Sequence, residues 1–207
     1  MEAFIFLAYE LLVSLLPCLA AFALLELRPG GKERRGKLLR MTLLLCFVLY
    51  LVAVYHVTGV GTLYDGLLYQ GEIRTEQINL SPFSRDIDLT GYLLNVLLFL
   101  PLGVLLPLIW KAWGKVGRVL CIGAGFSFLI EASQLLNNRS TDVDDLILNT
   151  LGAFVGFLLY KGLAHRKKET APLPIPRLSP LWYIAITFAG RFFLFNDMGL
   201  ARVLYGF

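Results

Sequence analysis

The chain has 207 residues, of which 57% are hydrophobic and 16% carry a charge. Soluble domains hold about 25% charged residues and a smaller apolar fraction, so this composition excludes a soluble enzyme, a disordered linker and a small disulfide-rich domain. The formal net charge is +4, but the lysines and arginines lie between apolar runs and form no basic stripe that would indicate a nucleic-acid partner. We therefore expect an integral membrane protein that binds no nucleic acid.

Six long apolar segments predict six transmembrane helices, which would give an all-α, multi-pass helical bundle. The segments cover residues Phe4–Leu27, Leu39–Val60, Tyr92–Trp113, Gly117–Leu136, Leu146–Leu163 and Pro180–Leu194. The sixth is the shortest and contains Arg191, which we expect either to pair inside the bundle or to extend toward the membrane surface. His56 lies at the end of the second segment, and we expect an interfacial rather than a catalytic histidine there.

The five connectors between these segments alternate in charge, and this alternation predicts the orientation of the chain. Most basic residues belong to the first, third and fifth connectors, which hold Arg28, Lys32, Arg34, Arg35, Lys37, Arg40, Lys111, Lys115, Arg118, Lys161, Arg166, Lys167, Lys168 and Arg177. The second and fourth are mainly acidic and hold Asp65, Glu72, Glu76, Asp86, Asp88, Asp142, Asp144 and Asp145 beside Arg74, Arg85 and Arg139. Because cytoplasmic connectors are enriched in lysine and arginine, we expect both termini to lie on the extracytoplasmic side.

Polar side chains gather near the outer ends of three of the predicted helices. Asn95 lies in the first turn of the third segment, and Glu131 and Gln134 share one face near the end of the fourth. The fifth segment follows the acidic stretch Thr141–Asp145 and continues to Asn149. Since an acid buried in a membrane is costly, Glu131 should have a polar partner or line a water-filled cavity. We therefore expect one outward-facing polar pocket shared by the three helices.

One stripe along the fifth segment combines polar groups with glycines. Its members follow one another at spacings of three or four residues: Asp142, Asp145, Asn149, Gly152 and Gly156. Residues at this spacing lie on one helix face, and a Gly-x-x-x-Gly pair lets a neighbouring helix approach closely. We therefore expect the stripe to face protein. The segment Ile78–Phe83 mixes apolar and turn residues, and we expect it to fold back over the pocket at the membrane interface.

Each of these residues also has a structural interpretation, which the sequence leaves open. Glu131 could form an ion pair with Arg139 that only holds two helices together. Arg139 could instead pair with the nearby aspartates or bind an anionic head group. The Thr141–Asp144 spacing fits a capping box at a helix start. Asn95 and Gln134 could simply be hydrogen-bonding contacts between helices.

Four blocks of this sequence resemble the VanZ-like family and occur in the order that the family has them. The blocks are Asn79–Phe83, Asn95–Gly103, Ser127–Gln134 and Arg139–Gly152. The family consists of small membrane proteins of bacteria, and its namesake is associated with low-level resistance to the glycopeptide teicoplanin. The resemblance therefore implies a multi-pass protein of the bacterial cytoplasmic membrane. It also implies three parts: an extra N-terminal helix with a basic loop (1–38), a VanZ-like core (39–163), and a basic linker with a C-terminal hydrophobic helix (164–207).

The preferred functional hypothesis is a binding protein of the cell envelope. No Ser/His/Asp or Cys/His arrangement, P-loop or HExxH motif is found among the polar residues. The partners expected from the family context are membrane lipids, with a lipid-linked cell-wall precursor or a lipoglycopeptide as the ligand. Capture of that ligand would contribute to teicoplanin resistance. The residues expected to bind it are Asn95, Glu131, Gln134, Arg139, Asp142, Asp145 and Asn149.

The alternative hypothesis is a membrane-embedded enzyme acting on a lipid-linked phosphate. Glu131 would be its catalytic residue, acting as a general base or as a metal ligand. Carboxylate oxygens are the ligands that hard divalent cations prefer, so Glu131, Asp142 and Asp145 are the candidates for holding such a cation. A small transporter is disfavoured, because the inner halves of the segments carry few charges and no inverted repeat is evident.

Overall fold

The structure of the protein is a computed structural model, which describes residues 2–25, 34–71, 75–84, 88–166, 176 and 178–206. Its long helices are α1 (Glu2–Leu25), α2 (Arg34–Thr58), α4 (Leu89–Ile109), α5 (Val116–Gln134), α6 (Val143–Arg166) and α7 (Pro180–Leu194). Its shorter elements are α3 (Leu63–Leu68), α8 (Asp197–Tyr205), the 3-10 turns η1 (Thr75–Gln77), η2 (Lys111–Trp113) and η3 (Leu135–Asn137), and the two-residue strands β1 (Ile78–Asn79) and β2 (Thr141–Asp142).

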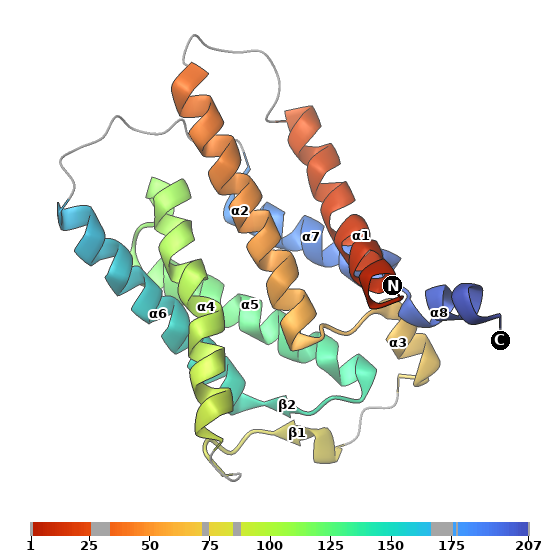
Figure 1. Ribbon diagram of the computed structural model, residues 1–207. Coiled ribbons are helices and arrows are strands. Elements are labelled where there is room, and N and C mark those ends of the chain that lie inside the picture. The colour runs from red at the N-terminus through yellow and green to blue at the C-terminus, as the bar shows by residue number, and fades with distance from the viewer. Residues whose placement is uncertain are drawn as a thin grey trace.

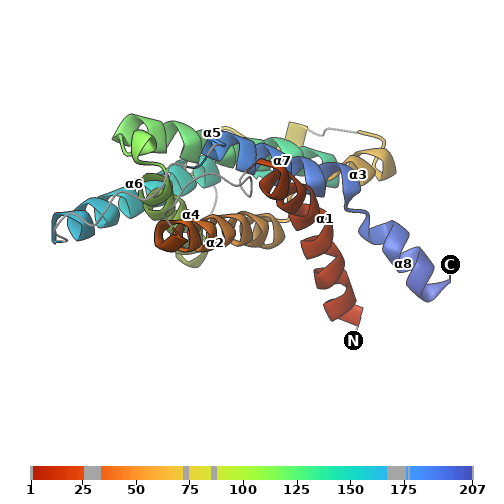
Figure 2. The ribbon, with the colours of Figure 1, turned by 90° about the horizontal axis from the view of Figure 1, so that it is seen from above.

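The predicted all-α membrane bundle is confirmed. In the described ranges, five segments are long and apolar enough to cross a membrane, and α7 with α8 makes a sixth if this pair, bent by 41°, is one span. The β1–β2 pair and α3 lie toward the lower end of Figure 1, where α2 ends and where α4 and α6 begin. Viewed from above, α1 and α8 project from the same side of the bundle (Figure 2).

Some of the charges used to predict orientation fall outside the described residues, namely Arg28, Lys32, Glu72, Arg74, Arg85, Asp86, Lys167, Lys168 and Arg177, as do the side chains of Arg34, Arg35, Lys37 and Arg166. The predicted orientation and the predicted division into three parts therefore stay predictions.

Two helix starts differ from the sequence-based boundaries because a side chain caps each of them. The Asp88 side chain accepts a hydrogen bond from the Thr90 N–H at 3.1 Å, so α4 begins at Leu89 rather than at Tyr92. The Asp142 side chain accepts one from the Asp144 N–H at 3.0 Å, so α6 begins at Val143, three residues earlier than predicted. Local capping thus extends both helices beyond their apolar cores.

The glycine stripe of α6 packs against α4, as its spacing predicts. A Cβ at Gly152 would collide with the backbone of Val96, and a Cβ at Gly156 would collide with the backbone of Leu100. Gly103 of α4 makes the same kind of close contact with α6, since a Cβ there would meet the backbone of Ala153. The two helices are therefore in backbone contact, which holds the polar residues above the stripe at a set distance from α4.

Candidate functional site

A polar cavity of about 500 Å³ lies where the ends of α2, α4, α5 and α6 meet. It is lined by Val57, Thr58, Asn95, Leu98, Glu131, Gln134, Asn138, Arg139, Ser140, Asp145 and Asn149. Six of the seven residues expected to bind a ligand are in this lining, and the seventh, Asp142, is not. Sequence reasoning did not single out Thr58, Asn138 or Ser140, which carry no charge and belong to no helical stripe.

Asn149 is the most deeply buried amide of the cavity, with 2% of its surface exposed. Its Nδ2 donates a hydrogen bond to the Ser127 Oγ at 3.0 Å. Its Oδ1 has no hydrogen-bond partner in the described part of the chain. Nearly all buried polar atoms in proteins are hydrogen-bonded, and leaving one unpaired costs about 1–3 kcal/mol. The Asn149 oxygen is therefore an acceptor that a ligand or an ordered water would satisfy.

Glu131 is 5% exposed and stabilises the turn between α5 and α6. Its Oε2 accepts a hydrogen bond from the Asp142 N–H at 3.1 Å, and its main-chain carbonyl accepts one from the Thr141 hydroxyl at 2.9 Å. No ion pair joins Glu131 to Arg139 among the described residues. The polar partner expected for this buried acid is thus a backbone N–H, and its other carboxylate oxygen makes no hydrogen bond to a described residue.

Asn95 and Asp145 join α4 to α6 inside the cavity. The Asn95 Nδ2 donates a hydrogen bond to the Asp145 Oδ1. This contact agrees with the interpretation of Asn95 as a hydrogen bond between helices. Because both side chains also line the cavity, a ligand there would meet the amide and the carboxylate together.

Gln134 and Arg139 both bind the open end of α2. The Gln134 Nε2 donates to the Thr58 carbonyl at 2.7 Å, and an Arg139 Nη donates to the same oxygen. Carbonyls in the last turn of a helix have no partner within the helix, so an amide and a guanidinium are suitable donors for them. Gly59, which has φ +63°, lies directly under the Arg139 guanidinium, and a Cβ there would occupy the same space.

Asp142 differs from the prediction. It was expected in the stripe with Asp145 and Asn149, but it lies in β2, one residue before α6 begins, so its side chain does not follow the helical spacing. It caps α6 and accepts a hydrogen bond from the Asn79 Nδ2 at 3.1 Å.

The candidate cation site of Glu131, Asp142 and Asp145, which belongs to the enzyme alternative, is not formed by this geometry. In the ranges that the structure describes, no three His, Cys, Asp or Glu side chains are placed to hold a metal ion. Glu131 and Asp145 still share the cavity, whereas the Asp142 carboxylate is engaged at the start of α6 and with Asn79. The donor set therefore does not fit a three-carboxylate cation site.

The capping box that the Thr141–Asp144 spacing would allow is also absent from the described contacts. Thr141 donates to the Glu131 carbonyl instead. Asp144 is 2% exposed and accepts hydrogen bonds from the Phe83 N–H and from the Tyr92 hydroxyl, each at 2.8 Å. Asp144 therefore links the start of α6 by hydrogen bonds to the start of α4 and to the segment before α4.

The segment Ile78–Phe83 does fold back, but beside the cavity rather than over it. Ile78 and Asn79 pair in parallel with Thr141 and Asp142, and no residue of this segment lines the cavity. Pairing of β1 with β2 is what holds it at the start of α6. The segment thus supports the α5–α6 turn, on which Glu131 and Arg139 depend for their positions.

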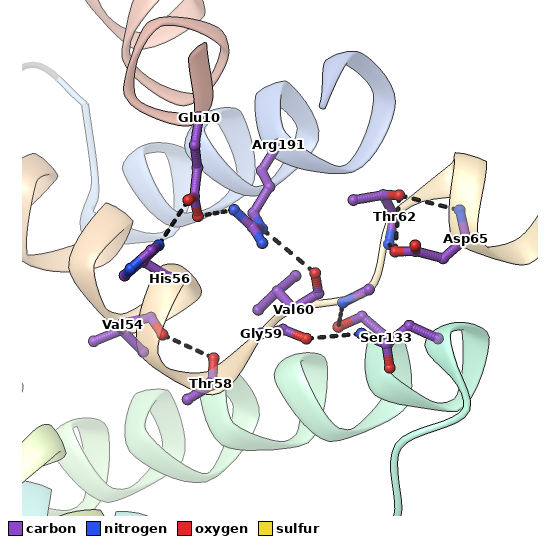
Figure 3. A network of polar contacts seen from close by, with 12 residues as sticks. Glu10, Val54, His56, Thr58, Gly59, Val60, Thr62, Asp65, Ser133 and Arg191 are labelled. Atoms are coloured by element: carbon purple, nitrogen blue, oxygen red, sulfur yellow. Dashed lines mark hydrogen bonds and ion pairs between the residues drawn. The ribbon is translucent and has the colours of Figure 1, made fainter. Parts of the chain in front are cut away.

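A second polar network connects the terminal helices to the end of α2 (Figure 3). Glu10 of α1 and Arg191 of α7, which are 5% and 6% exposed, form an ion pair, so Arg191 pairs inside the bundle. The other Glu10 oxygen lies 2.7 Å from the His56 Nδ1, and the Arg191 Nε donates to the Val60 carbonyl at 3.4 Å. Sequence reasoning missed Glu10, although an acid within an apolar segment was a signal for it.

The comparisons with known proteins concern the part of the chain that forms the first cavity. Residues 47–165 match the VanZ/LLP1 family. Over 134 residues, the chain is 31% identical to Protein VanZ of Enterococcus faecium, and the alignment covers 63% of this chain and 78% of that protein. No solved structure matches the chain. All seven predicted ligand-binding residues lie in the range matched by the family, whereas Glu10 and Arg191 lie outside it.

Proposed function

Because this chain belongs to the VanZ/LLP1 family, we propose that its polar cavity binds the head group of a cell-envelope ligand and thereby contributes to teicoplanin resistance. The ligand is a lipid-linked cell-wall precursor or a lipoglycopeptide. Both have a polar head and a lipid tail, which suits a polar cavity at the end of a bundle of apolar helices. Capture would lower susceptibility by sequestering the antibiotic or by shielding its target.

The observation that carries this proposal is the unpaired Asn149 Oδ1. A buried acceptor without a partner destabilises a fold unless something binds to it. The cavity around it has a volume of about 500 Å³, within the range of about 300–1,000 Å³ that is typical of small-molecule sites. A hydroxyl or amide N–H of a head group would supply the missing hydrogen bond.

The acidic groups of the cavity favour the same class of ligand. Glu131 and Asp145 both line it and supply acceptor oxygens, so the cavity suits groups that donate hydrogen bonds. Sugar hydroxyls, amides and amines meet this requirement. The enzyme alternative has less support, because in the described part of the chain Glu131, Asp142 and Asp145 do not form the three-carboxylate cation site that it would use.

We place the cavity on the extracytoplasmic side of the bacterial cytoplasmic membrane, with both chain termini on that side. The support is the charge alternation of the connectors, since the connector that holds Arg139 has few basic residues and the one that holds Lys115 is basic. An outward cavity can reach lipid-linked precursors after their export and can reach antibiotics that do not cross the membrane.

The proposal is tested by expressing the chain in a teicoplanin-sensitive host and measuring the minimal inhibitory concentration. We expect Asn149→Leu, Glu131→Gln and Asp145→Asn each to remove most of the protection that the unaltered chain gives. The matched controls are Glu76→Gln and Asp88→Asn, which alter acids outside the cavity and should leave protection intact. Immunoblots of membranes check that all variants reach equal levels. Full protection by all three cavity variants would refute the proposal.

A further inference from the structure

A second polar cavity, of about 220 Å³, lies next to the first and is built partly by the terminal helices. Its polar lining includes His56, Asp65, Asn137, Arg139, Arg191 and Asp197. Arg191 and Asp197 come from α7 and α8, beyond the range matched by the family. Figure 3 shows Glu10 in contact with Arg191, whose side chain extends to the carbonyl of Val60 in the wall of this cavity.

The two cavities share a wall that is formed by the end of α2 with the residues after it and by the guanidinium of Arg139. Val57 and Arg139 line both cavities, Thr58 lines only the first, and Gly59 and Val60 line only the second. The end of α2 therefore separates them, and the Arg139 side chain crosses this boundary. A molecule that occupies both cavities would therefore contact Arg139 and Val57.

Arg139 has charge and donors to offer such a molecule. Its hydrogen bond in the described structure goes to the Thr58 carbonyl, and it makes no ion pair with any described residue. A guanidinium carries five N–H donors in a planar fork that matches phosphate and carboxylate oxygens. The side chain is exposed, so most of those donors can meet an incoming oxyanion.

The positive charge of Arg191 and the acids nearby are largely engaged within the protein. Arg191 is paired with Glu10, and one Asp65 oxygen accepts hydrogen bonds from both the N–H and the hydroxyl of Thr62. Asp197 accepts a hydrogen bond from the Met198 N–H at 2.8 Å. Arg139 is therefore the cation best placed to neutralise an oxyanion at this boundary.

The second cavity also offers acceptors for hydroxyl groups. The Asn137 Nδ2 donates to the Gly59 carbonyl at 2.8 Å, which leaves its Oδ1 without a partner among the described residues. The Asp65 and Asp197 carboxylates lie in the same lining. A group that combines an oxyanion with hydroxyls would satisfy both kinds of site, whereas an isolated anion would be repelled by the two acids.

We propose that the second cavity and Arg139 form a subsite for the phosphate or carboxylate of a head group that also carries hydroxyls. This inference rests on the proposed function, because the remainder of the head group occupies the first cavity. Arg139 lines both cavities, so an oxyanion bound to it leaves the hydroxyls at the acceptors of the second cavity and the rest of the head group in the first cavity. The terminal helices thus extend the family cavity by a subsite that the matched range alone does not complete.

The test measures binding of three small probes to the full chain by saturation-transfer NMR. The chain is held in octaethylene glycol monododecyl ether, a detergent without phosphate or sugar. Glycerol 3-phosphate represents the phosphate source, glycerate the carboxylate source, and glycerol the neutral control. We expect at least one anion to bind at least tenfold more tightly than glycerol, and the tighter one identifies the source. Equal binding of all three probes would overturn the proposal.

Two substitutions with opposite expected effects on anion binding locate the subsite. Arg139→Gln should weaken binding of the preferred anion about tenfold or more, because it removes a charged hydrogen-bond donor. The matched control is Arg118→Gln, since Arg118 is also exposed and donates to a backbone carbonyl, that of Ala112, but lies far from both linings. Asp197→Asn should tighten binding several-fold, whereas Asp88→Asn should not. Unchanged binding by both Arg139→Gln and Asp197→Asn contradicts the proposal.

Two further comparisons keep the outcome interpretable. Arg139→Lys retains the charge, so its affinity for the preferred anion should lie between those of the unaltered chain and Arg139→Gln. This variant keeps the test available if Arg139→Gln fails to fold. If Arg139→Gln loses the probe while Asn149→Leu retains teicoplanin protection, the subsite stands and the proposed function fails. If the unaltered chain and Arg139→Gln bind the probe equally while Asn149→Leu loses teicoplanin protection, the subsite fails and the proposed function stands.

Discussion

The ion pair between Glu10 and Arg191 is expected to couple the terminal helices energetically. Both side chains are almost fully buried, so water screens neither charge. Removing one partner leaves an uncompensated buried charge and costs about 3–5 kcal/mol, whereas replacing both by apolar residues of similar volume is often close to neutral. We therefore expect Glu10→Leu and Arg191→Met each to destabilise the protein strongly and the double variant to recover most of the loss.

The magnitude translates into a thermal shift that can be measured in detergent. For a chain of this size, 1 kcal/mol corresponds to about 2–4 °C in Tm, so each single variant should lose about 6–20 °C. The double variant should lie within a few degrees of the unaltered protein. Fluorescence-detected thermal unfolding of the purified chain gives all four values of this double-mutant cycle. Arg118→Met serves as the control, because Arg118 is exposed and should barely change the Tm.

The reasoning is refuted if the two single losses add up in the double variant. Additivity would mean that Glu10 and Arg191 act independently and that their contact contributes no coupling energy. A residual loss of a few degrees is expected, because Glu10→Leu also removes the hydrogen bond to His56 and Arg191→Met the one to Val60.

Three other outcomes follow from the packing and from the charge pattern. Gly152→Ala should destabilise the protein in thermal unfolding because the added Cβ meets the Val96 backbone, whereas Gly162→Ala on the same helix meets nothing within 4 Å and should be neutral or stabilising. Equal shifts for the two would contradict backbone contact between α4 and α6. Asp144→Ala should free the segment before α4, so that a cysteine introduced at Ser81 reacts faster with a thiol reagent. Asp145→Ala should leave that reaction rate unchanged, and equal rates in the two variants would disprove that Asp144 holds the segment. A cysteine at Ser140 should react with an impermeant reagent added to whole cells and one at Lys115 should not, and the reverse result would invert the proposed orientation.

Much of the bundle could be predicted because membrane helices are recognisable in a sequence as long apolar runs. The apolar runs gave spans that agree with the helices to within a few residues, and the Gly152–Gly156 spacing indicated a face in close helix contact. The clustering of Asn95, Glu131 and Asn149 could also be predicted, since each lies near one end of a span and depth in the membrane follows from position along a helix.

The individual roles of the acids at the start of α6 could not be predicted. The spacing places Asp142 with Asp145 only if the helix already includes both, and capping by Asp142 excludes it from the helix. The spacing of Asp144 from Thr141 fits a capping box, but Asp144 binds Phe83 and Tyr92, which lie far from it in the sequence. Hydrogen bonds between distant segments therefore decided which carboxylate lines the cavity and which one holds the fold.

The sequence by itself determined the class of the protein, its family, the approximate spans and the set of polar residues from which the cavity is drawn. These properties depend on composition and on periodicity along single helices, and both are local. Only the tertiary structure decided that Glu10 meets Arg191 across the bundle and that Arg139 stands between two cavities. Such contacts depend on how helices distant in the chain pack together, and no local pattern encodes that arrangement.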